Sequence, residues 1–306
     1  MIRKASIDIG TNSTRLLITD IDSSGNFIPI LTKERITRLG DGLDDTSRLS
    51  FKAMQRVLIV LKEYLNFCKK NDVSDIVVFA TSATRDAVNR DEFIGKIERE
   101  TGIGCRILSG EEEALFSFRG VISDFRFDAD FLVCDIGGGS TEFIFGRGKM
   151  LIDRKSLNIG SRRMMREFLH SDPVKMKELS DLKAFIMGEL KKNLPDSAPV
   201  SGCVCVGGTA TTLAMMDKKI DIAEAEKVHH GELSRSHLLQ IISELQKKTI
   251  REQQKIVGLH PERADVILAG AVIVHCIMEF YNLSKISTSL RDLLFGILME
   301  KERGNE

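Results

Sequence analysis

Residues 134–142 read CDIGGGSTE, and the same pattern stands near the N-terminus. Aligning residues 7–18 (IDIGTNSTRLLI) with residues 134–145 (CDIGGGSTEFIF) places Asp, Ile, Gly, Ser and Thr at matching positions. In each copy an apolar run of strand length ends in Asp-Ile-Gly, a short polar turn follows, and a second apolar run begins. The sequence therefore predicts two β-hairpins that descend from an internal duplication.

The residue types in these two turns indicate a phosphate ligand. Glycine, serine, threonine and asparagine offer unobstructed backbone N–H groups and hydroxyls, which together can form an anion-binding nest. Asp8 and Asp135, at the two strand ends, are placed to hold a divalent cation or its waters beside that phosphate. One glycine-rich hairpin usually only turns the chain. Two in register can clamp a phosphate and a metal between two lobes, and we adopt this interpretation.

Length, charge and cysteine content limit the class of protein. A chain of 306 residues can fill two domains, each with its own core. Lys plus Arg and Asp plus Glu both total 44, which argues against bulk electrostatic capture of nucleic acid or membrane. The six cysteines show no CxxC spacing, and no apolar run approaches the roughly 20 residues that span a bilayer. We expect a cytoplasmic protein with thiols that pack in the core.

Two segments of the first half carry polar groups where α/β sheets expose ligand sites. Residues 75–80 (DIVVFA) predict a buried strand that ends in Thr, Ser and Arg, so Arg85 is either a phosphate ligand or a surface arginine. Ser109 and the second glutamate of GEEEA have the spacing of a capping box, which predicts a helix start. These three acids either cap the helix or include one that activates a water. The pattern alone leaves both interpretations open.

A third turn of similar chemistry follows in the second half. Residues 201–206 predict a strand, and the GGTATT at 207–212 then starts a helix, which suits either a phosphate- or nucleoside-facing turn or tight packing. The GRGK at 146–149 is not a P-loop, because the flanking glycine and Ser/Thr are absent. Helices are expected over 261–280, where Arg263 and Asp265 either line a cleft or pair structurally, and over about 290–302.

With DIGTNS, GEEEA, DIGGGSTE and GGTATT in this order, the sequence resembles the exopolyphosphatase and guanosine pentaphosphate phosphohydrolase (Ppx/GppA) family. That family belongs to the sugar kinase, Hsp70 and actin superfamily, and the resemblance runs from residue 6 to about 296. It implies an α/β fold of two ribonuclease H-like lobes with an interlobe cleft. The lobes are expected at residues 1–124 and 125–289, with a C-terminal helix (about 290–306) on the first lobe. The HD-type domain of longer members is expected to be absent.

The resemblance also implies roles for individual residues. Glu113 falls on the family's proposed catalytic glutamate, and Glu142 falls on a second proposed catalytic acid. Mg²⁺ is expected at Asp8 and Asp135. Substrate phosphates are expected at the three loops and two arginines, namely Gly10, Thr11, Asn12, Ser13, Arg15, Arg85, Gly137, Gly138, Gly139, Ser140, Thr141, Gly207, Gly208 and Thr209.

The implied reaction is hydrolysis of a terminal phosphoanhydride, in which Glu113 positions the attacking water. Inorganic polyphosphate is the expected substrate, and conversion of pppGpp to ppGpp is a further expected activity. No nucleic acid or membrane partner is expected, and a homodimer is left open. The family usually has Ser where Thr11 stands. Family members tend to read Leu-Arg-Glu-Gly near the end, whereas residues 290–293 read LRDL, which leaves the close helix contact there an open question.

Three alternatives are weighed against this prediction. The first is a phosphohydrolase that acts mainly on pppGpp, with weak polyphosphate activity. The second is an ATP-dependent sugar or acid kinase with the same lobes, which would need an acceptor. The third is a regulator that binds (p)ppGpp without turnover. The presence of all four acidic site residues, Asp8, Glu113, Asp135 and Glu142, argues against this alternative.

Overall fold

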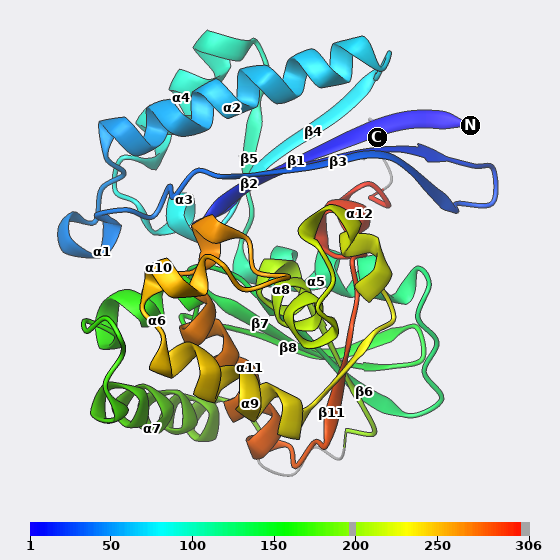
Figure 1. Cartoon of the computed structure of the whole chain (residues 1–306). Helices are drawn as coiled ribbons and strands as arrows, with labels where there is room; N and C mark the ends of the chain where they lie inside the picture. Colours follow the sequence, from blue (N-terminus) through cyan, green and yellow to red (C-terminus); the bar gives the residue numbers. More distant parts are fainter. Residues whose placement is uncertain (196–199, 301–306) are drawn as a thin grey trace. The chain divides into compact units, whose positions relative to one another are not determined.

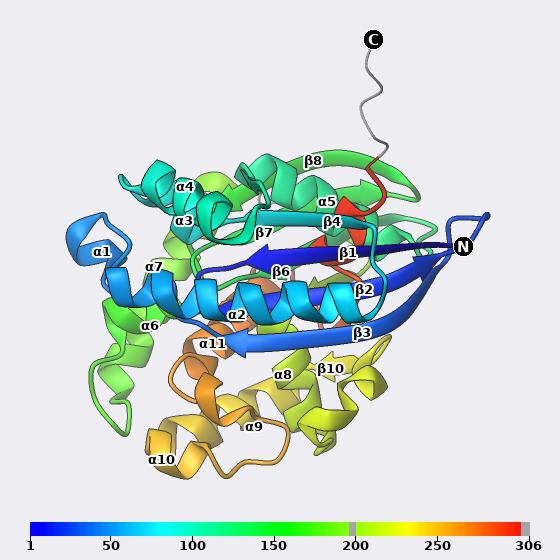
Figure 2. The same cartoon turned by 90° about the horizontal axis from the view of Figure 1, so that it is seen from above.

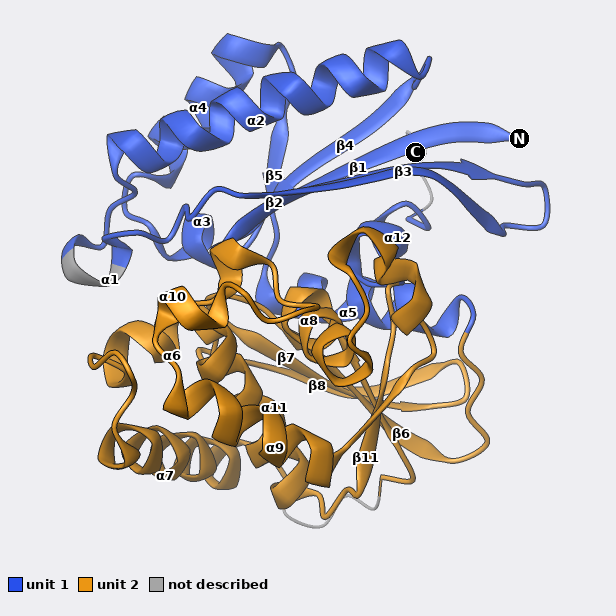
Figure 3. Ribbon diagram, viewed as in Figure 1, with its two compact units in different colours: residues 1–124, 291–306 blue, residues 125–290 orange. Residues whose placement is uncertain are grey.

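The computed structural model describes residues 1–195 and 200–300 (Figure 1). The chain divides into two compact units, which are coloured in Figure 3. Unit 1 comprises residues 1–124 together with the chain from residue 291 onward, and unit 2 comprises residues 125–290. Each unit has its own mixed β-sheet with helices packed on it. The predicted α/β class is confirmed, and we describe each unit by itself.

The sheet of unit 1 has five strands in the order β3-β2-β1-β4-β5. The first three form an antiparallel meander, and β4 and β5 continue the sheet parallel to β1. This is the strand order expected of a ribonuclease H-like lobe. Its strands are β1 (Ile2–Ile9), β2 (Ser13–Ile21), β3 (Phe27–Ile36), β4 (Asp75–Ala80) and β5 (Cys105–Ile107).

Helices cover both faces of this sheet because successive strand residues point to opposite sides. Leu16, Ile18 and Val78 pack into one core with the long helix α2, which Figure 2 shows running along the strands. Leu17 and Phe79 lie in the other core, with residues of α5 and α12. The helices of unit 1 are α1 (Leu43–Thr46), α2 (Phe51–Lys70), α3 (Ser82–Asp86), α4 (Arg90–Thr101), α5 (Gly110–Ile122) and α12 (Leu293–Ile297).

The sheet of unit 2 has six strands in the order β10-β11-β9-β6-β7-β8. Its β6-β7-β8 meander is antiparallel, and β9 and β11 lie parallel to β6. The meander and its parallel neighbour therefore repeat the plan of unit 1. The strands are β6 (Asp130–Ile136), β7 (Thr141–Arg147), β8 (Met150–Leu157), β9 (Cys203–Val206), β10 (Glu232–Ser234) and β11 (Lys285–Thr288).

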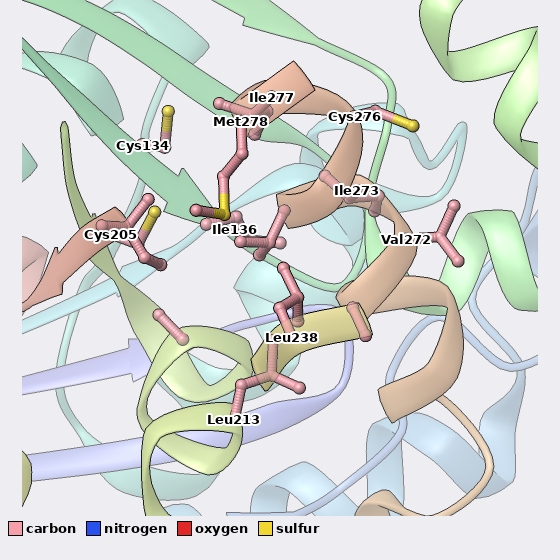
Figure 4. Close-up of a cluster of buried hydrophobic side chains, with 14 of the residues drawn as sticks. Cys134, Ile136, Cys205, Leu213, Leu238, Val272, Ile273, Cys276, Ile277 and Met278 are labelled. Carbon is pink, nitrogen blue, oxygen red and sulfur yellow. The ribbon is translucent and has the colours of Figure 1, made fainter. Parts of the chain in front are cut away.

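The core of unit 2 is built around one largely apolar helix, α11 (Figure 4). Ile273 and Ile277 pack among side chains of the sheet and of the other helices, which include the thiols of Cys134 and Cys205. These thiols are free, so they serve as small apolar side chains, as expected. The helices are α6 (Ser161–Phe168), α7 (Met176–Asn193), α8 (Gly207–Lys218), α9 (Arg235–Lys247), α10 (Ile250–Gln253) and α11 (Ile267–Phe280), with 3₁₀ turns at Ile222–Val228 and Pro261–Arg263.

Two helix predictions were wrong in extent. The helix expected over 261–280 is broken, because Pro261–Arg263 is a short 3₁₀ turn and α11 starts only at Ile267. The C-terminal helix expected over about 290–302 starts later, since the Asp292 side chain caps Leu294 and fixes the first turn there, and it ends at Ile297. Residues 301–306 lie outside the described residues.

Two glycines settle the question of the close helix contact in unit 1. Helix α12 packs on α5, where a side chain on Gly120 would overlap the Asp292 backbone and one on Gly296 would overlap the Phe116 backbone. The close approach therefore persists although Leu293 stands where the family tends to have glycine.

Within the described ranges, no helix has the length and apolar character needed to cross a bilayer.

Candidate active site

The first predicted phosphate turn is a tight hairpin whose backbone is fixed from both sides. The Gly10 N–H donates to the Ser13 carbonyl (2.9 Å), and a Cβ on Gly10 would lie only 2.9 Å from that oxygen. The Asn12 carbonyl accepts the N–H groups of Thr37 (3.1 Å) and Arg38 (2.8 Å). The turn is thus held in one conformation without help from a ligand.

Thr11 connects this turn to the segment that carries Arg85. Its hydroxyl accepts a hydrogen bond from the Ala83 N–H (3.2 Å), in the first turn of α3. Its carbonyl accepts the Gly40 N–H (2.9 Å). The carboxyl end of β4 and the hairpin turn therefore lie side by side in unit 1, as expected for a binding edge of a parallel sheet.

Asp8 lies at the end of β1 and is only 5% exposed. Its Oδ2 accepts hydrogen bonds from Arg15 Nε (3.0 Å) and Nη2 (2.6 Å). Its Oδ1 is also buried, yet it has no hydrogen-bond partner among the residues that the structure describes. Burial raises the pKa of Asp8 above its ordinary value, although the charge of Arg15 opposes this shift. A buried carboxylate oxygen without a partner suits a hard divalent cation as a ligand.

The three acids at the start of α5 have three different environments. Glu111 is exposed to solvent. Glu112 completes the predicted capping box with Ser109 and also pairs with Arg106. Glu113 is 6% exposed, and its Oε1 accepts a hydrogen bond from Arg85. Of the three, the structure sets Glu113 apart by burial and by its partner, a distinction that the sequence pattern alone could not make.

Arg85 holds its position through the backbone of the neighbouring strand. Its Nη1 donates to the Leu108 carbonyl (2.8 Å), just after β5, and also to Glu113. The guanidinium thus joins α3 to the first turn of α5. Arg15, which was also predicted to contact phosphate, contacts the carboxylates of Asp8 and Asp292. A contact of either arginine with phosphate stays a prediction.

The second hairpin, in unit 2, repeats the backbone hydrogen bond and the strand register of the first. The Gly137 N–H donates to the Ser140 carbonyl (3.0 Å), as Gly10 does to Ser13. Asp135 stands opposite Glu142 across the strand pair, in the register in which Asp8 stands opposite Arg15. The duplicated pattern in the sequence therefore corresponds to two hairpins of the same register. The Thr141 hydroxyl is buried and donates to the Ile159 carbonyl, which makes it a structural contact.

The carbonyl groups of the second turn point toward the start of α6. Gly137 accepts the Ser161 N–H (2.9 Å), and Gly138 accepts the N–H groups of Arg162 (2.9 Å) and Arg163 (3.0 Å). A trans peptide places its N–H opposite its C=O. The N–H groups of the same peptide units therefore point away from α6, which is the orientation that an anion nest requires.

Two buried acids lie beneath this turn. Glu142 is 2% exposed, and its Oε1 accepts a hydrogen bond from the Ser156 hydroxyl (2.7 Å). Asp135 is also buried, and Gly207 lies directly against it, because a Cβ on Gly207 would come within 2.8 Å of Asp135 Oδ1. The structure thus brings the second and third predicted loops together. Gly207 also has a φ of 84°, which favours glycine.

The third loop forms the start of α8. Among the described residues no side chain caps this helix, so the N–H groups of its first turn, at Gly207, Gly208 and Thr209, are available to an anion. Arg263 is 6% exposed, and its guanidinium packs against Gly208. A buried cation beside a helix N-terminus is a second feature that favours an anionic ligand.

The sequence predictions did not commit to Arg263 and missed Asp292. Arg263 comes from the 3₁₀ turn before α11, and its neighbour Asp265 pairs with Arg162 (3.4 Å), the structural alternative that the sequence left open. Asp292 contacts Arg15 from the far end of the chain. The local sequence gives no signal for either residue, since Arg263 stands between Glu262 and Asp265 and Asp292 follows Arg291.

The chain is similar to known phosphatases along almost its whole length. A profile of the Ppx/GppA phosphatase family matches residues 17–304. Exopolyphosphatase 2 of Mycobacterium tuberculosis is 32% identical, with 98% of both chains covered. A bifunctional 3-dehydroquinate synthase/phosphatase of Fusobacterium nucleatum is 37% identical over 97% of this chain, which spans only 46% of that relative.

A further relative and a solved structure extend the similarity. A guanosine-5'-triphosphate,3'-diphosphate pyrophosphatase of Vibrio atlanticus is 28% identical, over 97% of this chain and 58% of that protein. The crystal structure of the Aquifex aeolicus Ppx/GppA protein is 32% identical, with a TM-score of 0.82 over 97% of this chain and 96% of that one.

Proposed function

Because the chain belongs to the Ppx/GppA phosphatase family, we propose that it is an exopolyphosphatase that hydrolyses the terminal phosphoanhydride bond of inorganic polyphosphate. The observation that carries this proposal is the environment of Glu113, a buried acid paired with Arg85 beside a phosphate turn. A carboxylate held in place by a guanidinium can orient a water and accept its proton. Its two acidic neighbours are used for capping or face solvent.

The chain's own residues would divide the work of the reaction. The N–H groups of Gly138 and Gly139 and those of the first turn of α8 bind phosphate oxygens. Arg85 adds positive charge and orients Glu113, which takes the proton of the attacking water. Glu142 is proposed as a second acid. Such a reaction depends on positioning and electrostatics more than on covalent chemistry.

Each of the two acids at the strand ends has the chemistry of a ligand for a hard divalent cation. Asp8 presents a buried oxygen without a partner among the described residues, and Asp135 presents a buried carboxylate beside Gly207. We therefore assign both acids as ligands of Mg²⁺. When bound, Mg²⁺ would offset the charge that develops on the phosphoryl oxygens. The prediction that both units bind one substrate in a cleft stays a prediction.

The same chemistry extends to pppGpp, whose terminal phosphate is also a phosphoanhydride. The Vibrio atlanticus relative, named for action on guanosine-5'-triphosphate,3'-diphosphate, supports this second substrate. We further propose that the protein works in the cytoplasm. Its six cysteines, which all lie within the described ranges, are free, as a reducing compartment keeps them.

Release of phosphate by the wild-type chain tests the proposed function. Polyphosphates of several lengths and pppGpp are incubated separately with Mg²⁺, with no acceptor present. We expect phosphate release from polyphosphate and from pppGpp. The ratio of the two rates gives the substrate preference. A parallel reaction contains ATP with and without a sugar or acid acceptor, and ATP turnover that requires the acceptor would instead identify a kinase. Tight (p)ppGpp binding without any phosphate release would identify a regulator.

A further inference from the structure

Asp292 is a buried acid that belongs to unit 1 although it comes from the far end of the chain. It is 4% exposed and lies at the start of α12. Its Oδ1 accepts the Leu294 N–H (3.0 Å) and so caps the helix. Its Oδ2 accepts a hydrogen bond from Arg15 Nη1, while the other side of the same guanidinium holds Asp8. One arginine therefore bridges two buried carboxylates.

Neither helix capping nor neutralisation of Arg15 explains the charge of Asp292. A neutral Asn or Ser caps a helix as well as Asp does. Asp8 alone would already balance Arg15, so the second carboxylate leaves the group of three with a negative charge. Glu34, which stands opposite Arg15 on β3, adds further negative potential at Asp8. Buried charge of one sign is costly unless something compensates it.

We propose that Asp292 is a positioning residue that acts through Arg15 on the cation site at Asp8. Asp292 and Asp8 share the guanidinium of Arg15. Asp292 thereby holds this guanidinium against Asp8 Oδ2 and neutralises part of its positive charge. Asp8 Oδ1, which has no hydrogen-bond partner among the described residues, then keeps the orientation and the negative potential that a divalent cation needs. This inference rests on the proposed assignment of Asp8 as a metal ligand.

The packing of α12 holds Asp292 in place for this role. The Ser6 hydroxyl on β1 donates to the Leu294 carbonyl (2.7 Å). The Asp292 backbone lies so close to α5 that only glycine fits at position 120. Arg291, the preceding residue, pairs with Asp124 (3.1 Å). These contacts hold residues 291–294 against α5 and against β1, the strand that carries Asp8.

The test compares Asp292→Asn with Ser6→Ala in the full-length chain. Asn keeps the capping oxygen but removes the charge next to Arg15. Ser6→Ala removes a contact of α12 but leaves Asp8, Arg15 and Asp292 intact. Binding of Mn²⁺, as a probe for the divalent cation, is measured by electron paramagnetic resonance on metal-free protein. Thermal unfolding of each variant is recorded alongside.

We expect Asp292→Asn to weaken Mn²⁺ binding by about 10- to 100-fold, the range typical of residues that orient a metal ligand. Ser6→Ala should bind Mn²⁺ like the wild type. Asp292→Glu, which restores the charge, should recover affinity to within about threefold of wild type on the same reasoning. In phosphate release, the loss in Asp292→Asn should shrink as the Mg²⁺ concentration rises, which a merely structural defect would not do.

The outcomes separate this inference from the proposed function. Wild-type protein that binds no Mn²⁺ would contradict the assignment of Asp8 as a metal ligand. Wild-type protein that binds Mn²⁺, together with an equal affinity in Asp292→Asn, would overturn the role of Asp292. If Asp292→Asn does not fold, Asp292→Ser, which also keeps a capping oxygen, is measured in its place with the same criteria.

Discussion

At the scale of single residues, Glu111, Glu112 and Glu113 show how one helical turn gives three identical side chains different roles. Glu111 faces solvent, Glu112 closes the capping box, and Glu113 turns into the protein toward Arg85. The capping spacing was readable from sequence because it is local. The partner of Glu113 was not, because Arg85 stands 28 residues earlier and meets it only through the packing of β4 and β5.

The variant Glu113→Gln tests the residue-scale account. It keeps the size of the side chain and a hydrogen-bond acceptor for Arg85, but it removes the base. We expect turnover of polyphosphate to fall by about 100- to 10,000-fold, the usual contribution of a general base. Substrate binding should change little. The matched control is Glu111→Gln, which removes an equal charge from the same turn and should leave turnover intact. Equal losses in both variants would show that the charge of the turn matters and not the base.

At the scale of elements, glycines decide where backbones can meet. Gly120 and Gly296 allow α5 and α12 to approach so closely that a methyl group on either would overlap the opposite backbone. Gly207 does the same between α8 and the carboxylate of Asp135. The sequence showed the glycines of the loops as a motif. The glycines of the two helices carried no such signal. Their role depends on contact between two helices that lie more than 160 residues apart in the sequence.

Gly296→Ala should destabilise unit 1, because its new methyl group would overlap the Phe116 backbone, which cannot move aside cheaply. We expect the free energy of unfolding in urea to fall by about 2 kcal/mol, within the range for an overpacked site. The control is Gly188→Ala, in the exposed middle of α7 with no atom within 4 Å of the new methyl group. It should raise stability by about 0.5–1 kcal/mol. Unchanged stability in Gly296→Ala would contradict the close packing.

Gly207→Ala should impair catalysis by displacing Asp135. The new Cβ would lie 2.8 Å from Asp135 Oδ1, and the φ of 84° at this position disfavours alanine. A displacement of about 1 Å at a reacting site can lower kcat by about 100-fold, which is the expected loss. Gly202→Ala, on the preceding segment with open space around it, is the control and should retain activity. Full activity in Gly207→Ala would remove Asp135 from the proposed site.

At the scale of the whole molecule, the internal duplication was the most informative sequence feature. It predicted two α/β halves, and the hairpins at Asp8 and Asp135 indeed share one register. Features that depend on contacts between residues far apart in the sequence were harder to predict. The helix expected over about 290–302 begins only at Leu293, because the cap at Asp292 is set by Arg15 and α5 and not by local periodicity. The position of Arg263 beside the start of α8 likewise depends on a distant contact, the one with Gly208.

Asp8 of unit 1 and Asp135 of unit 2 are proposed to take part in one reaction. The most direct test of this proposal is polyphosphate turnover, at saturating substrate, by Asp8→Asn, Asp135→Asn and the double variant, with each variant confirmed as folded. We expect each single change to lower turnover by at least about 100-fold. The double variant should be no slower than the slower single variant, since residues that act as a unit are not additive. A single variant that keeps about half of the wild-type turnover, as two independent sites would allow, would show that Asp8 and Asp135 do not act in the same reaction.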